Sequence, residues 1–393
     1  MKKVIMIMAA VAAVAMVSCQ KPNNTNLDNV VLDGFYVVGD ATGSANIQAA
    51  YMMSAGVNEV DKKAREGMYE KYVALAANKE FTLAFYESGK VTKYGAVLSE
   101  VNTNGENDQP TVTIYKGKLL EGDAAKAMKV TKDGLYHIVL DLNKANDLSA
   151  AQIILAPVSW GVRGINGDWS WKEMTASAFD MKKMTWTIHF DNINAGDFKF
   201  AYGGGWKIQL DDAGNVKAET NLGEDMKPGG GNIGVLKADG VDITLTWNLA
   251  AGEIAKSYVY EFKATKVYAI DPKTEAGFTV GFSGTVNGWG DPADGFAAVL
   301  NASESKVTDA TSFAGTYVYD LASITLTAED LLKVRVNGAW IGYSDVTIEG
   351  LKAEEAATDG NIAVKEAGTF SVKISFSWNG GAASKIKLVF TKK

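Results

Sequence analysis

The sequence predicts an all-β protein built from three tandem Ig-like β-sandwich modules. Apolar residues recur at every second position in many short segments, which fits strands that bury one face. Glycine is abundant (40 residues) and proline is scarce (6), a mix that suits short strands joined by glycine turns. The same order of segments returns with a period of roughly 110–125 residues, which is right for tandem domains and too long for a solenoid repeat.

Composition and charge exclude several classes of function. With 47% hydrophobic and 22% charged residues, each module can bury a sizeable core. The net charge of −7 comes without a basic block, so nucleic acid is excluded as a partner and electrostatic attachment to anionic lipid is disfavoured. Cys19 is the one cysteine, so an exported protein of this sequence depends on its hydrophobic cores rather than on disulfides.

The N-terminus has the pattern of an export signal. Two lysines precede the apolar run 4–17, which is too short for a good membrane span. A cysteine at the end of such a run resembles a bacterial lipoprotein signal, cleaved before Cys19 and lipidated on it, although Met16 stands where leucine is usual. A plain secretory peptide with an incidental cysteine is the alternative. We therefore predict a lipoprotein signal peptide at 1–19 and a flexible polar tether at 20–32.

The predicted modules span 33–157, 158–264 and 265–393. About seven short strands in ~110 residues, with glycine turns between them, are typical of an Ig-like β-sandwich. One face of such strands is buried and the other is wet, as in antiparallel sheets. The segment 55–77 departs from this pattern, and its scattered charges fit either a short surface helix or a loop insertion.

One nine-residue element occurs twice, at 198–206 (FKFAYGGGW) and at 332–340 (LKVRVNGAW). Both copies read as an alternating strand, a turn of small residues and then a tryptophan outside the alternation. In the second copy, Lys333 and Arg335 point to one side of the strand and lead into Asn337. This polar face beside a turn tryptophan predicts a binding surface; a solvated face with a hydrophobic plug at its end is the alternative.

The nine tryptophans fall into two groups. Those in phase with apolar strand positions, or at the start of a strand, are expected in the cores: Trp160, Trp186, Trp247 and Trp378. An exposed indole leaves a large apolar surface in water, so tryptophans after turns either fold back over a sandwich or meet a partner. These are Trp169, Trp171, Trp206, Trp289 and Trp340.

A sugar is the ligand that suits an indole flanked by amides and cations. Its CH-lined face packs on an aromatic plane, and its hydroxyls need hydrogen-bonding groups in fixed directions. In the third module the predicted carbohydrate-binding residues are Trp340, Arg335, Asn337, Lys333 and Trp289. In the second they are Trp206, Lys199 and Trp169; because Ala201 and Gly203 replace Arg335 and Asn337, further polar groups would come from Lys207, Gln209 or Asp211.

These features together resemble the SusE/SusF family, outer-membrane lipoproteins of glycan-utilisation systems in Gram-negative bacteria. The likeness covers 158–393 well and 33–157 loosely. The motifs that carry it are the lipoprotein signal, the tandem sandwiches, the Gly-x-x-Asn-Gly-Trp opening at 284–289, the element Arg335-x-Asn337-x-x-Trp340, and the Gly-Asn-Ile-x-Val landmark at 231–235 and 360–364.

The resemblance implies non-catalytic binding of a starch-type glycan beside a TonB-dependent transporter and its glycan-binding lipoprotein. It also implies attachment to the outer membrane through lipid on Cys19, facing the cell exterior. Two departures matter. No acidic cluster follows Cys19, which leaves periplasmic orientation open. The first module has no tryptophan at the aligned place, where a gapless alignment puts Gly89, so we expect it to be a spacer.

Nothing in the sequence marks an enzyme, a cofactor or a metal site. A glycosidase needs two positioned carboxylates roughly 5–10 Å apart, and no motif indicates such a pair. No nucleophile elbow, P-loop or Cys/His metal spacing occurs, and 211–215 is read as a hairpin turn rather than a calcium loop. His137 and His189 fall on the expected polar side of alternating strands and are predicted to be surface residues.

The sequence therefore predicts capture without catalysis. Several weak sites on one chain would raise the effective concentration for a polymeric, starch-like ligand on its way to import. The alternative is a structural or adhesive surface lipoprotein that uses the sandwiches as spacers.

Overall fold

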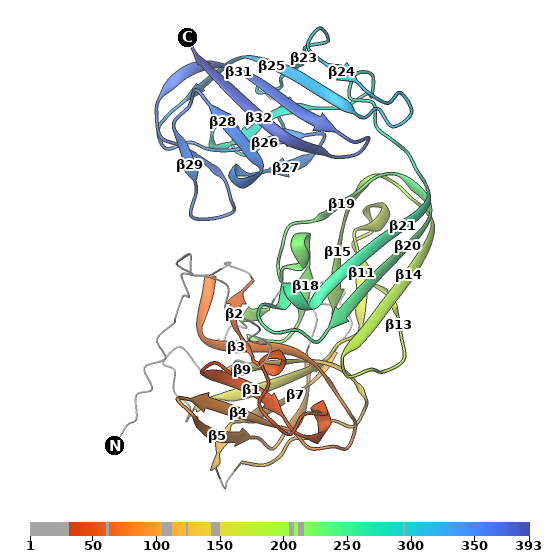
Figure 1. The fold of residues 1–393 in the computed structure, drawn as a ribbon, viewed down its shortest axis with the longest axis vertical. Helices are drawn as coiled ribbons and strands as arrows, with labels where there is room; N and C mark the ends of the chain where they lie inside the picture. The colour runs from red at the N-terminus through yellow and green to blue at the C-terminus, as the bar shows by residue number, and fades with distance from the viewer. Residues whose placement is uncertain are drawn as a thin grey trace, which may run out of the picture. The chain divides into compact units, whose positions relative to one another are not determined.

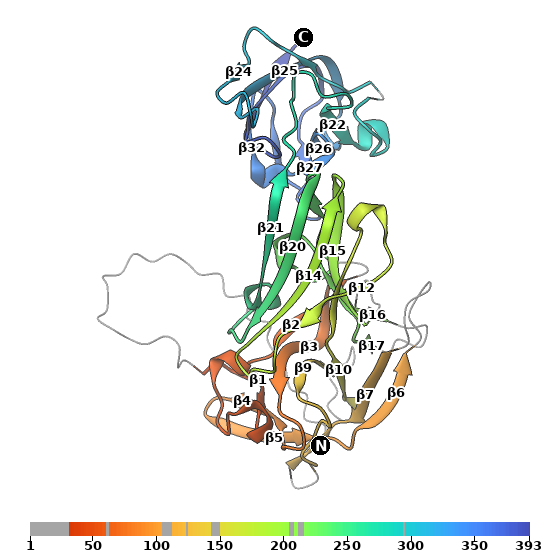
Figure 2. The ribbon, with the colours of Figure 1, turned by 90° about the vertical axis from the view of Figure 1, so that its right-hand side faces the viewer.

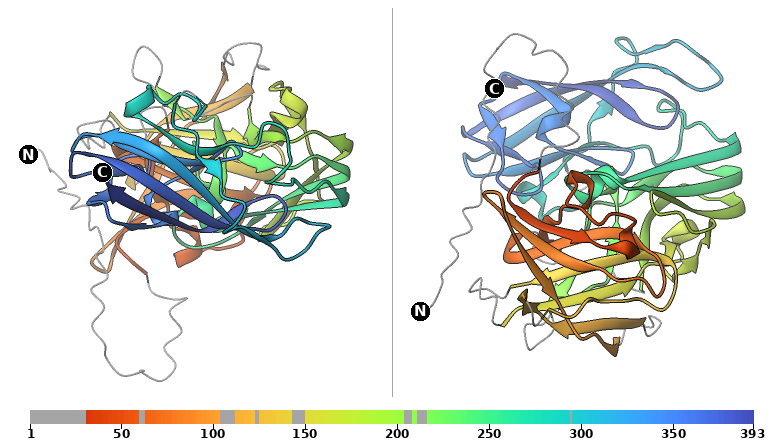
Figure 3. Two further views of the ribbon diagram at one scale, coloured as in Figure 1. Left: turned by 90° about the horizontal axis from the view of Figure 1, so that it is seen from above. Right: turned by 60° about the horizontal axis from the view of Figure 1, so that its bottom comes forward.

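The computed structural model describes residues 31–59, 63–103, 112–122, 125–142, 150–203, 208–210, 216–293 and 295–393. Over these residues the chain consists of β-strands and a few short 3-10 helices, as the two views in Figure 3 show. The predicted all-β class is confirmed; the finer assignment to three Ig-like modules stays a prediction. In this part of the chain no helix is long and apolar enough to cross a bilayer. The signal peptide and Cys19 lie outside the described residues.

The chain divides into two compact units, Met1–Lys266 and Val267–Lys393. The division falls next to the predicted boundary between the second and third modules. The first unit contains both the first and the second predicted module. In Figure 1 the first unit runs from red to green and the second from cyan to blue.

Two sheets enclose the core of the first module. The outer layer is a four-stranded sheet in the order β1-β4-β5-β8, with β1 at Gly34–Val38, β4 at Thr82–Glu87, β5 at Lys90–Gly95 and β8 at Leu120–Glu121. Facing it is a six-stranded sheet in the order β2-β3-β9-β10-β7-β6. Its strands are β2 (Ser54–Asn58), β3 (Lys63–Leu75), β9 (Gly134–Asp141), β10 (Gln152–Pro157), β7 (Val112–Lys118) and β6 (Ser99–Thr103).

The segment 55–77 is neither a helix nor a plain loop, so both expectations for it were wrong. It forms most of the antiparallel pair β2 and β3. Val73 and Leu75 of β3 enter the core of the first module, whereas Tyr72 and Ala74 enter a second core on the other face. A strand that is buried on both faces loses the apolar/polar alternation. In β3 the buried Glu70 and Lys71 also interrupt the apolar run, so the sequence pattern concealed the strand.

The second face of the six-stranded sheet packs against the second module. Residues of both modules, Tyr72 and Val139 with Trp160 and Phe200 among them, belong to one buried cluster. The prediction that His137 is a surface residue was wrong, because this packing buries it completely. The polar side of β9 would be exposed to solvent in an isolated module, but in this protein the second module covers it.

His137 has polar partners in this junction. Its Nε2 lies 2.8 Å from the Glu70 carboxylate, its Nδ1 is hydrogen-bonded to the Tyr202 hydroxyl, and its ring stacks on Tyr72 with centroids 4.3 Å apart. The Lys71 ammonium donates to the Ala250 carbonyl oxygen at 2.6 Å. The first two modules are thus joined through hydrogen bonds as well as apolar contact.

The second module repeats the two-sheet plan. One sheet has the order β12-β11-β15-β18, with β19 also paired to β15, and the other has the order β13-β14-β20-β21. Trp186 and Trp247 are buried between them, as predicted. The strands are β11 (Trp160–Arg163), β12 (Lys172–Glu173), β13 (Thr175–Ala176), β14 (Lys183–Ile193), β15 (Gly196–Tyr202), β18 (Thr220–Leu222), β19 (Ile233–Val235), β20 (Ala238–Asn248) and β21 (Tyr258–Val267), with the small hairpin β16 (Gln209–Leu210) and β17 (Val216–Lys217) beside them.

The second compact unit, Val267–Lys393, contains nearly all of the predicted third module. Its first sheet has the order β22-β26-β30-β29, with β27 also paired to β26; its second has the order β23-β25-β31-β32-β28, with β24 paired to β25. Trp378 is buried in the core, as predicted. The strands are β22 (Val280–Gly284), β23 (Val299–Leu300), β24 (Lys306–Val307), β25 (Gly315–Leu326), β26 (Leu331–Val336), β27 (Ala339–Ile341), β28 (Val346–Glu349), β29 (Ala353–Glu355), β30 (Ile362–Val364), β31 (Gly368–Trp378) and β32 (Ala383–Lys392).

Candidate functional site

The second copy of the repeated element is a tight hairpin of β26 and β27, labelled in Figure 2. The turn residues Asn337 and Gly338 have φ of 47° and 86°, the positive pair that a two-residue type I′ turn requires. Burial alternates along β26 as predicted, with Leu332, Val334 and Val336 in the core. Arg335 pairs with Trp340 across the hairpin. Directly opposed residues share a face of a sheet, so both side chains lie on the outer face.

A loop after β22 brings a second tryptophan to this hairpin. The Asn287 side chain holds the loop, accepting from the Gly284 N–H at 2.9 Å and donating to the Phe282 and Gly290 carbonyl oxygens, both at 3.3 Å. Trp289 has φ of 65°, and its backbone N–H donates to the Gly284 carbonyl oxygen at 2.8 Å. A left-handed backbone at a bulky residue costs on the order of 1 kcal/mol and persists only where surrounding contacts impose it.

Trp289 and Trp340 form one exposed aromatic surface, which we call the paired indoles. Their ring centroids are 6.2 Å apart and their planes are inclined by 43°. Their exposed fractions are 37% and 46%, which is high for the residue type with the largest apolar side chain. Neither ring is folded into the sandwich, so both are available to a ligand.

A guanidinium group lies over one of these rings. The Arg335 Cζ is 3.8 Å from the Trp340 ring centroid, well inside the range of a cation–π contact. Its Nη2 also donates to the Gly338 carbonyl oxygen at 3.0 Å, which ties the side chain to the turn of its own hairpin. Arg335 and Trp340 therefore act as one structural element.

The other two predicted residues of the third module lie close by. Lys333 is on the same outer face as Arg335, opposite Ser283 of β22. Asn337 occupies the first left-handed position of the turn, and its N–H donates to the Thr279 carbonyl oxygen at 2.6 Å. The turn alone explains an asparagine there, so a hydrogen bond from Asn337 to a sugar stays a prediction.

The loop tryptophans of the second module have different environments. Trp169 follows the β11 loop as Trp289 follows the β22 loop, and it is 39% exposed. Arg163 of β11 donates to its carbonyl oxygen at 2.9 Å. Trp171 is folded back: it covers Gly161, and its indole N–H donates to the Ala201 carbonyl oxygen at 3.1 Å.

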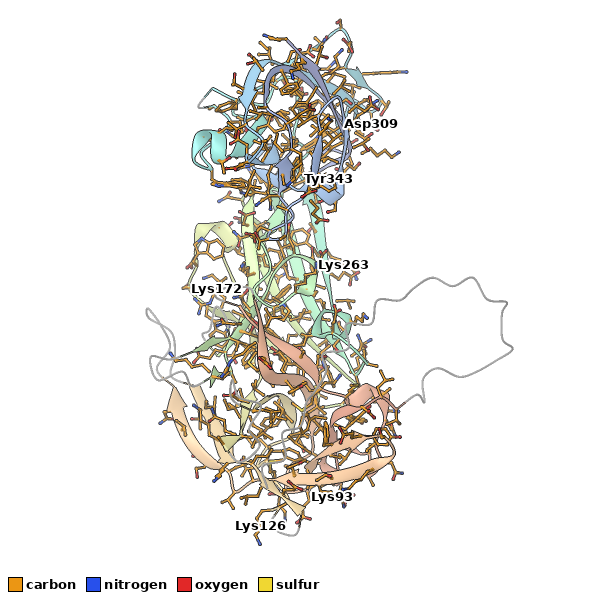
Figure 4. The ribbon with its side chains drawn as sticks, turned by 90° about the vertical axis from the view of Figure 1, so that its left-hand side faces the viewer. Lys93, Lys126, Lys172, Lys263, Asp309 and Tyr343 are labelled. Atoms are coloured by element: carbon orange, nitrogen blue, oxygen red, sulfur yellow. The ribbon has the colours of Figure 1, made fainter. Side chains whose placement is uncertain are left out.

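The charged groups beside these tryptophans have ion-pair or hydrogen-bond partners within the second module. Lys172, labelled in Figure 4, pairs with Asp168 at 2.7 Å, and hydrogen bonds from Lys172 and Ser170 hold the pKa of that carboxyl well below its usual range. The Lys199 ammonium donates to the Gly230 carbonyl oxygen at 2.6 Å. Trp206 lies outside the described residues, as do Lys207 and Asp211, so the site predicted around Trp206 stays a prediction.

The first module has the same type of hairpin, but no tryptophan stands at the place of Trp340. The turn of β4 and β5 has φ of 47° at Ser88 and 84° at Gly89, and Tyr86 pairs with Val91 as Arg335 pairs with Trp340. The counterpart of Trp340 is therefore Val91, and the gapless alignment to Gly89 was wrong by two residues. The absence of a tryptophan at this place in the first module still holds.

The site has the groups of a binding surface. Indole and guanidinium do not exchange protons near neutral pH, so the paired indoles and Arg335 can hold a ligand but supply no acid, base or nucleophile. Among the described residues, no group of three or more His, Cys, Asp or Glu side chains could hold a metal ion. His189 is an exposed residue, as predicted, and a hydrogen bond to Asp242 raises its pKa.

The sequence predicts the residues of the candidate site one by one, and whether they bind a glycan stays a prediction. Two relations between them were missed. Sequence reasoning did not bring Trp289 and Trp340 together, since no local pattern joins residues so far apart. It also missed the stack of Arg335 on Trp340. That stack had a signal: an Asn-Gly turn between two strands predicts a two-residue hairpin, which sets position 335 opposite position 340.

Comparison with known proteins shows a likeness in structure and none in sequence. No protein-family model matches the chain, and no curated protein matches it. Among solved structures, the crystal structure of SusF from Bacteroides thetaiotaomicron matches 91% of this chain and 77% of that chain, at 14% identity and a TM-score of 0.20. The chain thus has a structural match to SusF. A likeness this weak is not evidence of a shared function, so a function for this chain has to be argued from the geometry of the candidate site.

Proposed function

We propose that the protein binds a starch-like polysaccharide or oligosaccharide without cleaving it and so aids capture for a TonB-dependent glycan import system. The observation that supports this is the pair of exposed indoles, Trp289 and Trp340, 6.2 Å apart on the outer face of the third module. Attachment to the outer membrane through Cys19, facing the exterior beside the transporter and its glycan-binding lipoprotein, belongs to the same proposal.

Two neighbouring rings suit a chain of sugars better than a single small molecule. Each indole can stack on the CH face of a different sugar, and planes inclined by 43° suit a chain that curves as starch does. Lys333 and Asn337 lie near enough to offer hydrogen-bond donors to hydroxyls at the rim. Stacking of this kind contributes on the order of 1 kcal/mol per ring, so one site is weak and several sites on one chain are needed for firm capture.

Affinity electrophoresis in native gels tests the proposal. Wild type, Trp289→Ala, Trp340→Ala and the double variant would be run against a panel of α- and β-linked glycans. We expect retardation of the wild type in starch-like glycans, a partial loss in each single variant and a larger loss in the double variant. Val299→Ala is the control, because Val299 is 74% exposed in the same module but lies on a different strand.

Three results would contradict the proposal. Unretarded migration of the folded wild type in every glycan would leave the structural or adhesive spacer as the better account. Retardation that survives in the double variant would place the glycan elsewhere on the chain. Release of reducing ends from any bound glycan would show an enzyme, which the groups at this site do not support.

A further inference from the structure

The stack of Arg335 on Trp340 is built entirely from one hairpin. Both residues lie on its outer face, directly opposite one another, and the guanidinium is 3.8 Å from the ring centroid. The same guanidinium donates at 3.0 Å to Gly338, whose backbone the type I′ turn holds in a left-handed conformation. The guanidinium is thus held by a hydrogen bond to the turn and by its contact with the Trp340 ring.

This arrangement changes what the arginine can do. Its Nη2 donates to the turn, and its flat face lies on the indole. The guanidinium covers one face of the Trp340 ring, and the side chain as a whole remains 46% exposed. A tryptophan on an exposed strand otherwise chooses among several rotamers, and a cation–π contact at an exposed site favours the stacked one by roughly two- to fivefold.

We infer that Arg335 is a positioning residue: it holds the Trp340 ring in the orientation that pairs with Trp289, rather than serving mainly as a donor to the sugar. This inference deepens the proposed function, and its consequence for glycan affinity rests on that function. The hairpin of the first module has Tyr86 and Val91 at the two places, and the second module has Ala201 at the place of Arg335. Among the described hairpins, the device therefore belongs to the third module.

The orientation of the two rings can be measured without any glycan. Two indoles this close couple their electronic transitions and give paired bands of opposite sign, an exciton couplet, in the far-ultraviolet circular dichroism spectrum. The contribution of this pair is the difference between wild type and Trp289→Phe, and Trp340→Phe should remove the same contribution. Both variants keep an aromatic side chain and spare the core, so the fold is expected to survive.

Arginine variants then separate positioning from direct contact. Arg335→Ala should reduce the couplet by roughly half or more, and Arg335→Lys, which keeps a cation near the ring, should retain most of it. Lys333→Ala is the matched control, since it removes the same charge from the same face of the same strand; it should leave the couplet unchanged. Across the Arg335 variants, glycan affinity should follow the couplet, with Arg335→Ala weaker by about threefold. Lys333→Ala is a control for the couplet alone, because Lys333 is itself a proposed contact to the sugar.

The outcomes are distinct. An intact couplet in Arg335→Ala, with or without a loss of affinity, would overturn the inference and make Arg335 a direct contact or a bystander. A lost couplet with wild-type affinity would overturn it as well, because ring orientation would then not matter for binding. A wild type that binds none of the glycans would end the proposed function, whereas the couplet series would still decide whether Arg335 positions the ring.

Discussion

The two compact units differ in what covers the outer faces of their sheets. In the first unit, the outer face of the six-stranded sheet of the first module is buried under the second module, and His137, Glu70 and Tyr202 are hydrogen-bonded within that junction. In the second unit, the outer face at β26 and β27 carries Arg335 and Trp340, the latter 46% exposed.

This difference shows that the same sandwich architecture can use the outer face of a sheet in two ways: packed against another module, or partly exposed. A polar residue on an outer face, such as His137, becomes a buried hydrogen-bonding group where a second module of the same unit packs on it, whereas Trp340 on the outer face of β27 stays 46% exposed. The turn at Ser88 and Gly89 and the turn at Asn337 and Gly338 have nearly the same φ values. The backbone is therefore shared, and the use of each face is decided by the side chains that stand on it.

The largest effect is expected from removing the imidazole in the junction. His137→Ala removes a hydrogen bond from the buried Glu70 carboxylate and opens a cavity beside Tyr72, which together should destabilise the first unit by about 3–5 kcal/mol. A urea titration read by hydrogen-exchange mass spectrometry reports the two units separately, and the second unit should be unaffected. His137→Gln, which keeps a polar group in place, should cost less. Equal losses in both units would show that the two do not unfold independently.

The second prediction concerns the buried ammonium of Lys71. Burial lowers its pKa from 10.5 to about 8. Because the folded-state pKa lies below the unfolded one, the unfolded chain binds more protons above pH 8, so this group makes folding more favourable as the pH rises from 8 to 10. The full shift corresponds to about 3 kcal/mol.

The test is the slope of stability against pH. In urea titrations at pH 7 to 10, the wild-type first unit should gain stability relative to Lys71→Met, in which the titrating group is gone. The second unit serves as an internal reference. Parallel pH profiles for the two proteins would show that Lys71 keeps an ordinary pKa.

The third prediction concerns Gly281, opposite Arg335 in β22. A β-carbon there would collide with the Phe296 carbonyl oxygen and lie 2.9 Å from Pro292, so the loop that carries Trp289 has to shift. Gly281→Ala should destabilise the second unit by about 1–3 kcal/mol and also weaken glycan binding. Gly196→Ala, where a β-carbon meets nothing within 4 Å, is the control. Wild-type stability for both variants would show that the loop yields freely.

Much of the fold could be predicted because period-2 alternation reports burial directly. It gave the buried positions of β26, the outward side of Arg335, and the core places of Trp186, Trp247 and Trp378. It fails where burial comes from a distant segment. His137 belongs to an alternating strand, but the covering sandwich is contributed by residues that follow it in the chain.

The candidate site was predictable in its residues and only partly in its geometry. The strand, the turn and Trp340 follow from local sequence, whereas the approach of Trp289 depends on how the β22 loop folds. Gly34, Gly161 and Gly281 stand at one register in the three modules, yet Met52, Trp171 and Phe296 cover them. Because these three covering residues differ in type and in position along the chain, they leave no shared pattern in the sequence.

The smallest effect is expected from placing an indole on the hairpin of the first module. Val91 is 48% exposed at the place of Trp340, so Val91→Trp should change the free energy of unfolding by less than about 0.5 kcal/mol. It should add no glycan binding, because Met52 rather than a second indole covers the neighbouring Gly34. Affinity electrophoresis of this variant on a Trp289→Ala, Trp340→Ala background measures the gain directly.

Val97→Trp is the matched control, since Val97 is 65% exposed in the same module but lies outside the hairpin. Retardation by Val91→Trp alone would show that one indole on this turn suffices, and the pairing with Trp289 would then be an accident of the third module. Retardation by both variants would indicate non-specific stacking on any exposed indole. If neither variant is retarded, as we expect, one exposed indole is not sufficient on a sandwich of this plan, which is the result that the proposed role of the paired indoles requires.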